Sequence, residues 1–339
     1  MLTDRGGGIG RIEYRVDGVL QADVAARPVE LDRPGADGKT RRTRPLDLPP
    51  GRHEVTALAY NADGKVASRA VTQVIEVDDP LARPPTLYGL VVGIDAYRDS
   101  ALRLKHSAAD AGALRDTLQA QGRPLFGKSD LRLLPNEDAT RERIEQEFAG
   151  LAEVVQPNDV FVLYLSGHAA IIGGTYYFVP QDVRYENEAT LRAGSLSEGR
   201  LKDLLKDIKA QKSVLLLDTC YAGAFAGRER LAFNFRGLEE KTAIDRLMQA
   251  TGRATLASSS AVQQALEGYE GHGVFTYALL QGLSRAADDR GNRNGTIEID
   301  ELSNYVSDTV PELTRRKWNI EQIPMRDILG QNFPIVQRQ

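Results

Sequence analysis

Cysteine is almost absent from this chain of 339 residues, which contains a single one, so no disulfide can form within it. Runs of about 18 apolar residues are also lacking, and the first residues have no apolar core of the kind that signal peptides need. Because the formal net charge is only −4, the charge balance favours neither nucleic acid nor an anionic membrane as a partner. These absences predict a cytoplasmic protein without a transmembrane helix.

The one cysteine lies in the most informative stretch, SVLLLDTCYAGAF at positions 213–225. Residues 214–217 are all apolar, which is typical of a strand buried on both faces of a helix-covered parallel sheet. Cys220 is therefore expected just past a strand end, where open α/β sheets position their ligands and reactive groups.

A second stretch with the same pattern, VFVLYLSGH at 160–168, ends in His168 and lies 52 residues upstream. A lone cysteine is most often a small buried hydrophobic residue, and a lone histidine is usually a satisfied polar one. A cysteine and a histidine at two neighbouring strand ends would also lie close enough to act as a nucleophile and its base. We interpret Cys220 and His168 as a catalytic dyad.

The stretches SGHA (166–169) and DTCYAGAF (218–225) resemble the histidine and cysteine boxes of the caspase-like cysteine peptidases, in particular the metacaspases and their bacterial, orthocaspase-like relatives. The resemblance covers about residues 86–285. Five further stretches agree in order: LYGLVVGIDAY (87–97), LKHSAADA (104–111), YFVPQDV (177–183), ASSSAVQQALE (257–267) and HGVFTYALLQGL (272–283).

The pattern after residue 86 alternates apolar strands with helices, which implies parallel strands joined by right-handed crossovers. The resemblance implies the α/β caspase-haemoglobinase fold, a mostly parallel sheet flanked by helices. The expected strands are 87–94, 130–134, 159–166, 213–218 and 253–258, and the expected helices are 107–121, 139–153, 197–209 and 273–285.

The N-terminal part has a different pattern. Segments such as 11–16 and 53–60 alternate polar and apolar residues, and Asp17-Gly18 and Asp63-Gly64 are turn signals between such runs, which predicts a small all-β sandwich over residues 1–77. Residues 49–64 resemble immunoglobulin-like modules, and His53 is expected to be exposed on a strand. Residues 78–86 (DDPLARPPT) are rich in proline and read as a linker, and 87–339 form the peptidase domain. The glycine run near the start suggests a fragment of a longer protein. The β domain is expected to be a spacer or to dock a partner.

The resemblance also implies a mechanism. Cys220 would attack the scissile carbonyl and His168 would protonate the leaving amine. The oxyanion donors would be the backbone N–H groups of Cys220 and of Ala169, which stands where the family usually has glycine.

Specificity follows from residues that share a side with the dyad. Positions i and i+2 of a strand point the same way, so Asp218 is expected beside Cys220 and Ser166 beside His168. The matching residues of metacaspases line the pocket for the residue before the cut, with an aspartate that corresponds to Asp110. Carboxylates there favour Arg or Lys in the protein or peptide substrate. The alternatives are a helix-capping Asp110 and a strand-capping Asp218.

Many metacaspases need calcium, which a cluster of aspartates binds. The matching set of residues is incomplete in this chain, so we expect no metal site and no cofactor. Asp182 matches one family aspartate, whereas 195–198 (SLSE) and Gly227 replace others. Residues 290–301 (RGNRNGTIEIDE) carry glycine and glutamate at the sixth and twelfth EF-hand positions. Arg290 cannot coordinate a cation, and flanking helices are not evident, so this stretch is interpreted as a turn.

Three further expectations concern single features. His106 opens the first helix and is expected near the pocket, and His272 is interpreted as a turn residue. Residues 227–241 combine glycine with basic residues and resemble a loop where caspase-like enzymes process themselves.

Two other functions stay open: a catalytically silent signalling scaffold, which the intact dyad disfavours, and a caspase that cuts after Asp, which Asp110 and Asp218 disfavour.

Overall fold

The computed structural model describes residues 2–3, 8–16, 19–20, 39–40, 45–46, 48, 51–77, 83–221, 254–258, 266–328 and 332–338. These residues fall into two compact units, an N-terminal one up to Val77 and a larger one that begins at Arg83. The predicted linker 78–86 falls partly outside the described residues, while Thr86 already belongs to a strand of the larger unit. The linker itself stays a prediction.

The described residues of the N-terminal unit form strands and no helix, as predicted. Its described strands form one antiparallel sheet in the order β3-β2-β5-β6 and a short ribbon of β1 with β4. The second, facing layer of a sandwich stays a prediction. The strands are β1 (Leu2–Thr3), β2 (Ile12–Val16), β3 (Val19–Leu20), β4 (Lys39–Thr40), β5 (Gly51–Ala59) and β6 (Val71–Val77).

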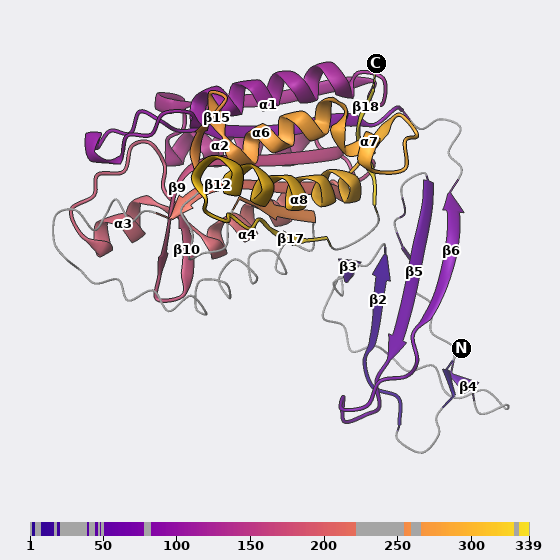
Figure 1. The fold of residues 1–339 in the computed structure, drawn as a ribbon. Helices are drawn as coiled ribbons and strands as arrows, with labels where there is room; N and C mark the ends of the chain where they lie inside the picture. Colours follow the sequence, from indigo (N-terminus) through magenta and orange to yellow (C-terminus); the bar gives the residue numbers. More distant parts are fainter. Residues whose placement is uncertain are drawn as a thin grey trace. The chain divides into compact units, whose positions relative to one another are not determined.

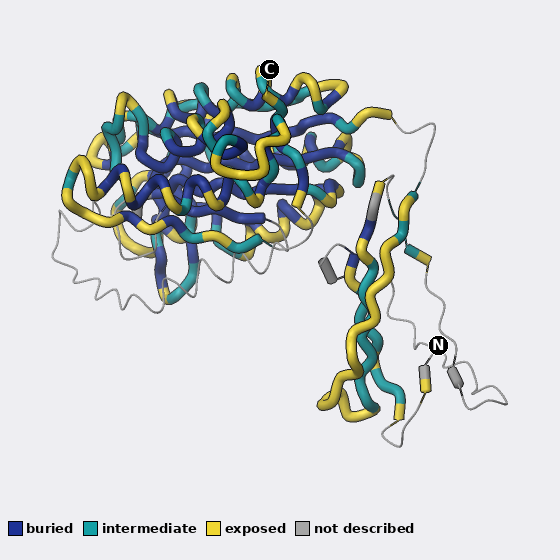
Figure 2. Tube along the Cα trace, turned by 45° about the vertical axis from the view of Figure 1, so that its right-hand side comes forward, coloured by how far each residue is buried: buried dark blue, intermediate teal, exposed yellow. Residues whose placement is uncertain are grey.

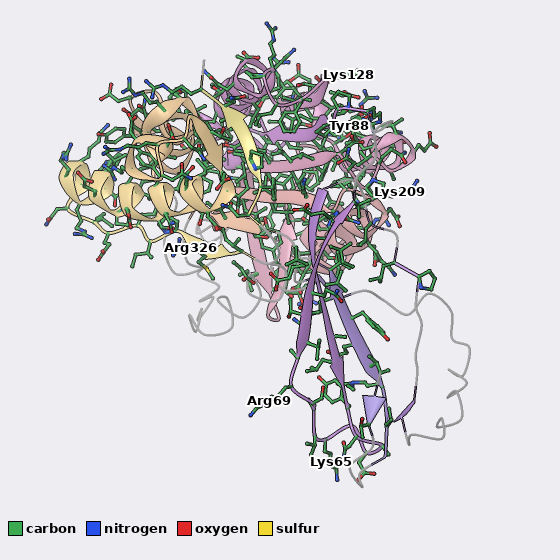
Figure 3. The ribbon with its side chains drawn as sticks, turned by 90° about the vertical axis from the view of Figure 1, so that its right-hand side faces the viewer. Lys65, Arg69, Tyr88, Lys128, Lys209 and Arg326 are labelled. Carbon is green, nitrogen blue, oxygen red and sulfur yellow. The ribbon has the colours of Figure 1, made fainter. Side chains whose placement is uncertain are left out.

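Few side chains of this unit are buried. Among its described residues only Val16 and His53 are buried, so the expectation that His53 is exposed is wrong. His53 lies in β5, where its register partner is Ile75 of β6. Figure 2 shows the unit mostly in teal and yellow, and in Figure 3 Lys65 and Arg69 project from the connection between β5 and β6.

The larger unit contains an eight-stranded sheet in which β7, β8, β9, β12 and β13 are all parallel to their neighbours in that group. The edge strand β17 is antiparallel to β13, and β10 is antiparallel to both of its neighbours, β9 and β11. The strands are β7 (Thr86–Gly93), β8 (Lys128–Pro135), β9 (Val160–Ile172), β10 (Thr175–Phe178), β11 (Leu196–Ser197), β12 (Lys212–Tyr221), β13 (Ala254–Ala257) and β17 (Met325–Asp327).

Helices cover both faces of this sheet, since its strands are apolar on both sides (Figure 1). Along β9, Phe161, Leu163 and Leu165 pack on the face covered by α2 and α4. Val162 and Tyr164 point to the opposite face, covered by α1, α6 and α8. The helices are α1 (Ser107–Gly122), α2 (Arg141–Val154), α3 (Glu188–Gly194), α4 (Glu198–Asp207), α6 (Val274–Gln281), α7 (Ala287–Arg290) and α8 (Ile299–Trp318).

Shorter elements complete the unit. Two antiparallel pairs lie outside the large sheet: β14 (Glu267–Tyr269) with β15 (His272–Gly273), and β16 (Thr296–Glu298) with β18 (Pro334–Gln337). Three single turns are η1 (Ser100–Leu102), η2 (Asn136–Asp138) and the π-turn η4 (Gly282–Ala286). Among the described residues no helix is both long enough and apolar enough to cross a bilayer.

The predicted α/β fold is confirmed, but two strands are longer than expected. The sequence predicts that β9 ends near 166, but the strand continues through His168 to Ile172, because the next strand, β10, runs back antiparallel to it and pairs with its last four residues. β12 likewise continues through Cys220 to Tyr221, in register with β9. The dyad residues thus lie within paired strands, not beyond their ends.

Candidate active site

His168 is fixed by groups from the loop that follows β7. Its Nε2 lies 2.9 Å from the carbonyl oxygen of Leu102, and its backbone N–H donates to the hydroxyl of Tyr97 at 2.7 Å. The two rings are also in contact, with centroids 5.1 Å apart. Because a carbonyl oxygen can only accept, Nε2 must carry the hydrogen, which leaves Nδ1 of the neutral imidazole with the lone pair. Nδ1 is therefore the nitrogen that can act as a base.

Gly167, directly before this histidine, has a backbone conformation that other residues rarely adopt. Its φ is +151°, and a Cβ built there would lie 2.5 Å from the Tyr97 hydroxyl oxygen. The close approach of the tyrosine to the strand, and hence its hydrogen bond to His168, requires glycine at this position.

Replacing Gly167 with alanine is expected to displace the Tyr97 hydroxyl and to strain the backbone, because both the contact and the φ angle disfavour a Cβ. We expect a loss of stability of about 1–3 kcal/mol and a fall in kcat greater than any change in KM. Thermal unfolding and steady-state kinetics measure both. The variant Gly112→Ala is the control, since a Cβ at that helical position meets nothing within 4 Å. Unchanged kcat in Gly167→Ala would contradict this account.

Cys220 and His168 are direct neighbours across the sheet. For Cys220 the structure describes the backbone, which lies in β12 as the register partner of His168 in the parallel strand β9. Neighbouring strands are about 4.8 Å apart, so the two residues are placed within reach of each other by ten consecutive residue pairs.

Ala169 of β9 lies between two strands, as the register partner of Tyr221 in β12 and of Phe178 in β10. The N–H and C=O of His168 point to Tyr97 and to Val179, away from β12. Because successive backbone groups of a strand alternate in direction, the N–H of Ala169 points toward β12. In paired strands this N–H belongs to the ladder between β9 and β12, so the role of Ala169 as an oxyanion donor stays a prediction.

Asp218, two residues before the cysteine, is buried and hydrogen-bonded. Its Oδ2 accepts the hydroxyl of Thr276 in the first turn of α6 at 2.7 Å, and this hydroxyl also contacts the Tyr164 hydroxyl at 2.7 Å. Ser166 is the register partner of Asp218 on β9, and it is buried as well. Asp218 and Ser166 are therefore adjacent, as the predicted pocket requires.

Asp110 reaches the same place from the first turn of α1. The start of that helix is fixed by Asp95, whose carboxylate accepts the N–H groups of Ser107 and Ala108 at 2.6 and 3.1 Å. Asp110 itself accepts the Gly273 N–H at 2.9 Å and contacts His272 Nδ1 at 2.5 Å. The alternative of a helix-capping Asp110 is not what these contacts describe, since Asp95 takes that role.

Gly273 lies directly against both pocket carboxylates. A Cβ built on it would be 3.1 Å from Oδ2 of Asp110 and 3.2 Å from Oδ2 of Asp218. The segment from His272 to Thr276 thus contacts both carboxyl groups, through the His272 imidazole and the Gly273 N–H on Asp110 and the Thr276 hydroxyl on Asp218.

Both carboxyl groups have raised pKa values. Burial and, after it, the negative charge of Asp218 together raise the pKa of Asp110 to about 8, against the Gly273 hydrogen bond. Burial raises the pKa of Asp218 to about 6, although hydrogen bonds from Thr276 and Ser258 oppose the shift. A buried acidic pair of this kind is stabilised by a cation placed between its members.

The residues considered for calcium have other partners. Asp182 accepts the N–H of Arg141 at the start of α2, and Ser197 caps α4 by accepting the N–H of Arg200. Gly227 lies outside the described residues. In the stretch 290–301 the expectation about helices is wrong: α7 ends at Arg290 and α8 begins at Ile299, directly after the three-residue strand β16. The side-chain oxygens of Asn292 and Asn294 accept N–H groups of the loop itself.

The sequence did not identify four of these contributors: the Leu102 carbonyl, Tyr97, Thr276 and the His272 side chain. Tyr97, Thr276 and His272 lie inside stretches that matched the family, so a signal was present but no role was assigned to it. The Leu102 contact involves a backbone carbonyl, for which residue identity carries no signal. His272, interpreted as a turn residue, does begin the strand β15 but also contacts Asp110.

Comparison with known proteins identifies the family of the chain. The family model described as "Caspase domain" matches residues 87–330. No curated protein sequence matches the chain. A crystal structure of a protein from Geobacter sulfurreducens is similar over 75% of this chain and 98% of that one, at 17% identity and a TM-score of 0.49. The match to residues 87–330 spans most of the chain, which therefore belongs to the caspase-domain family of cysteine peptidases.

Proposed function

We propose that the chain is a cysteine endopeptidase in which Cys220 and His168 perform the chemistry and Asp110, Ser166 and Asp218 select Arg or Lys before the cut. The observation that carries the proposal is the register of β9 and β12, which pairs His168 with Cys220 and Ser166 with Asp218. One pair of strands thus supports both the reacting groups and two of the three pocket residues.

The reaction would begin with proton transfer from the Cys220 thiol to Nδ1 of His168. The thiolate sulfur attacks the carbonyl carbon, and the carbonyl electron pair moves to oxygen, which accepts from the N–H groups of Cys220 and Ala169. Collapse of this intermediate breaks the C–N bond, and the imidazolium gives its proton to the leaving amine. Water, deprotonated by His168, then hydrolyses the thioester and restores the thiol.

Leu102 supports this cycle through the imidazole. Its carbonyl oxygen holds the hydrogen on Nε2, so Nδ1 is the nitrogen that exchanges the proton in both halves of the reaction. The same carbonyl would stabilise the imidazolium that forms after the first transfer, because a hydrogen bond to a charged donor is stronger than one to a neutral donor.

The charge of the two carboxyl groups supports this specificity. Asp110 and Asp218 are buried and lie on the same side of Gly273, where a built Cβ would approach both, and burial raises the pKa of each. A guanidinium or ammonium group between them would favour ionisation of both, whereas an acidic side chain would meet like charge. Basic residues before the cut are therefore favoured over Asp.

The test compares fluorogenic peptides that end in Arg, Lys or Asp, each with and without calcium. Cleavage after Arg and Lys, and not after Asp, is the expected result. Equal rates on all three peptides would contradict the acidic pocket, and the calcium arm decides whether that cation is needed.

Self-processing is a further part of the proposal. The segment 227–241, which lies outside the described residues, contains Arg228, Arg230, Arg236 and Lys241. An enzyme that cuts after basic residues would find acceptable sites there. Mass spectrometry of the purified protein beside its Cys220→Ala variant is expected to show fragments ending at one of these residues only when the cysteine is intact. An active enzyme that stays uncut would contradict the expectation.

A further inference from the structure

The imidazole of His272 lies on the carboxyl group that would receive the substrate. Its Nδ1 is 2.5 Å from Oδ1 of Asp110, while the Gly273 N–H occupies Oδ2 at 2.9 Å. Both oxygens of Asp110 therefore already have partners from β15. A substrate cation that binds Asp110 must share or replace one of them.

Exposure distinguishes the two partners. The Asp110 side chain is 2% exposed, whereas the His272 side chain that lies on it is 27% exposed. Gly273 is buried, and its N–H belongs to the backbone between β15 and α6. Among the described residues that contact Asp110, the histidine side chain is thus the one that reaches solvent and can turn away.

The charges around His272 bear on how firmly it is held. Burial lowers its pKa, and the positive charge of His106 lowers it further, while burial raises the pKa of Asp110 to about 8. The pair thus holds one proton between two groups that both favour their neutral forms. The groups that face it are Asp110 and His106 from the start of α1, Asp218 from β12 and Glu267 from β14, with Asp95 and Lys105 acting on Glu267.

We propose that His272 is a specificity-determining residue: it caps Asp110 in the free enzyme, and the Arg or Lys side chain of the substrate displaces it. The inference rests on the proposed function, since it assumes that Asp110 receives the substrate cation. A guanidinium group carries a permanent charge and binds a carboxylate with two hydrogen bonds, so it outcompetes an imidazole that is easily deprotonated. Displacement releases the proton that His272 and Asp110 share to solvent. The substrate cation then takes the place of the imidazole on the Asp110 carboxylate.

The kinetic test uses His272→Ala and His272→Gln with Arg-terminated peptides. The alanine variant is expected to lower KM about 3- to 10-fold with kcat unchanged, and more at pH 6 than at pH 8, because the cap holds its proton more strongly at low pH. The glutamine variant, which can still donate to Asp110 but holds no proton, should fall between the alanine variant and the wild type. His106→Gln is the matched control, since it removes a nearby imidazole and keeps the backbone carbonyl that accepts the Asp110 N–H.

A rise in KM for His272→Ala would overturn the proposal, because it would mean that the imidazole positions Asp110 for substrate. An equal effect in His106→Gln would also overturn it, since the change would then be one of general electrostatics. Thermal unfolding of each variant identifies a loss of folding.

A binding measurement separates this inference from the proposed function. In the Cys220→Ala protein, benzamidine is titrated while the imidazole resonances of His272 are followed by NMR. Displacement is expected to shift them toward those of an exposed histidine. If the wild type cleaves no Arg or Lys peptide but benzamidine still shifts the His272 resonances, the proposed peptidase function is wrong and the capping of Asp110 by His272 is supported. If the wild type cleaves these peptides and the resonances do not move, only the proposed capping is wrong.

Discussion

Replacing Cys220 with alanine is expected to abolish peptide cleavage and to leave the fold intact. The residue lies near the end of β12, where its backbone pairs with β9, and alanine preserves that pairing because it is small and compatible with a strand. Without the sulfur no acyl-enzyme can form, so the rate should fall by a factor on the order of 10⁴ or more. Fluorogenic peptide assays and thermal unfolding measure the two effects.

Ser213→Ala in the same strand is the matched control. Its hydroxyl donates to the Ala210 carbonyl at the other end of β12, distant from the site. We expect this variant to keep full activity. If Cys220→Ala retained measurable turnover while its unfolding temperature was unchanged, the cysteine would not be the nucleophile.

The second large effect is expected from Asp110→Asn, which keeps size and removes charge. Loss of one charge-assisted contact to the substrate cation should lower kcat/KM for Arg peptides by about 10- to 1000-fold. In the wild type, kcat/KM should rise with pH from about 6 to about 8, because the two pocket carboxyls have pKa values near these limits and only their ionised forms attract the cation. Initial rates across this range measure the dependence.

The same substitution is expected to stabilise the protein. The pKa of Asp110 is raised to about 8 in the folded state, so above its ordinary value near 3.8 the unfolded chain loses the proton first. Stability from this group is therefore present at low pH and is lost as the pH rises toward 8. Asparagine does not ionise, and the variant should gain on the order of 2–4 kcal/mol at pH 7 to 8.

The unfolding temperature should rise by several degrees at pH 8, and the two curves should approach each other near pH 4. Asp116→Asn, an exposed position on the same helix, is the control and should change neither stability nor activity. A less stable Asp110→Asn protein at pH 8 would contradict the raised pKa of this carboxyl group.

Much of the fold of the larger unit could be predicted from the sequence, because its buried strands are marked by short apolar runs. The apolar runs that became β7, β9 and β12 are buried on both faces, which few other structures permit. Parallel pairing of such runs then brings Ser166 opposite Asp218 and His168 opposite Cys220. The meeting of Asp110 with Asp218 came from the family resemblance, since the two residues are far apart in the chain.

The contacts that could not be predicted from the sequence depend on tertiary packing. The Leu102 carbonyl is placed by a turn after β7, and any residue there would supply the same oxygen. The contact between His272 and Asp110 joins β15 to α1 across the fold, and a histidine before a glycine gives no hint of it. Strand β9 continues past His168 because β10 pairs with its last residues, and the apolar run within 160–168 gives no sign of that pairing.

The parallel pairing of β12 with β13 has a consequence for a protein that is cut. These strands lie on either side of residues 222–253 in the chain, and each is bonded to the other through the backbone over four residue pairs. Helices α6 and α8, which follow β13, pack in the same core as α1. A break anywhere between the two strands would therefore yield two polypeptides that remain one molecule, held together by a shared sheet and core. Nicked enzyme should migrate as fragments under denaturing conditions and as a single species in native ones.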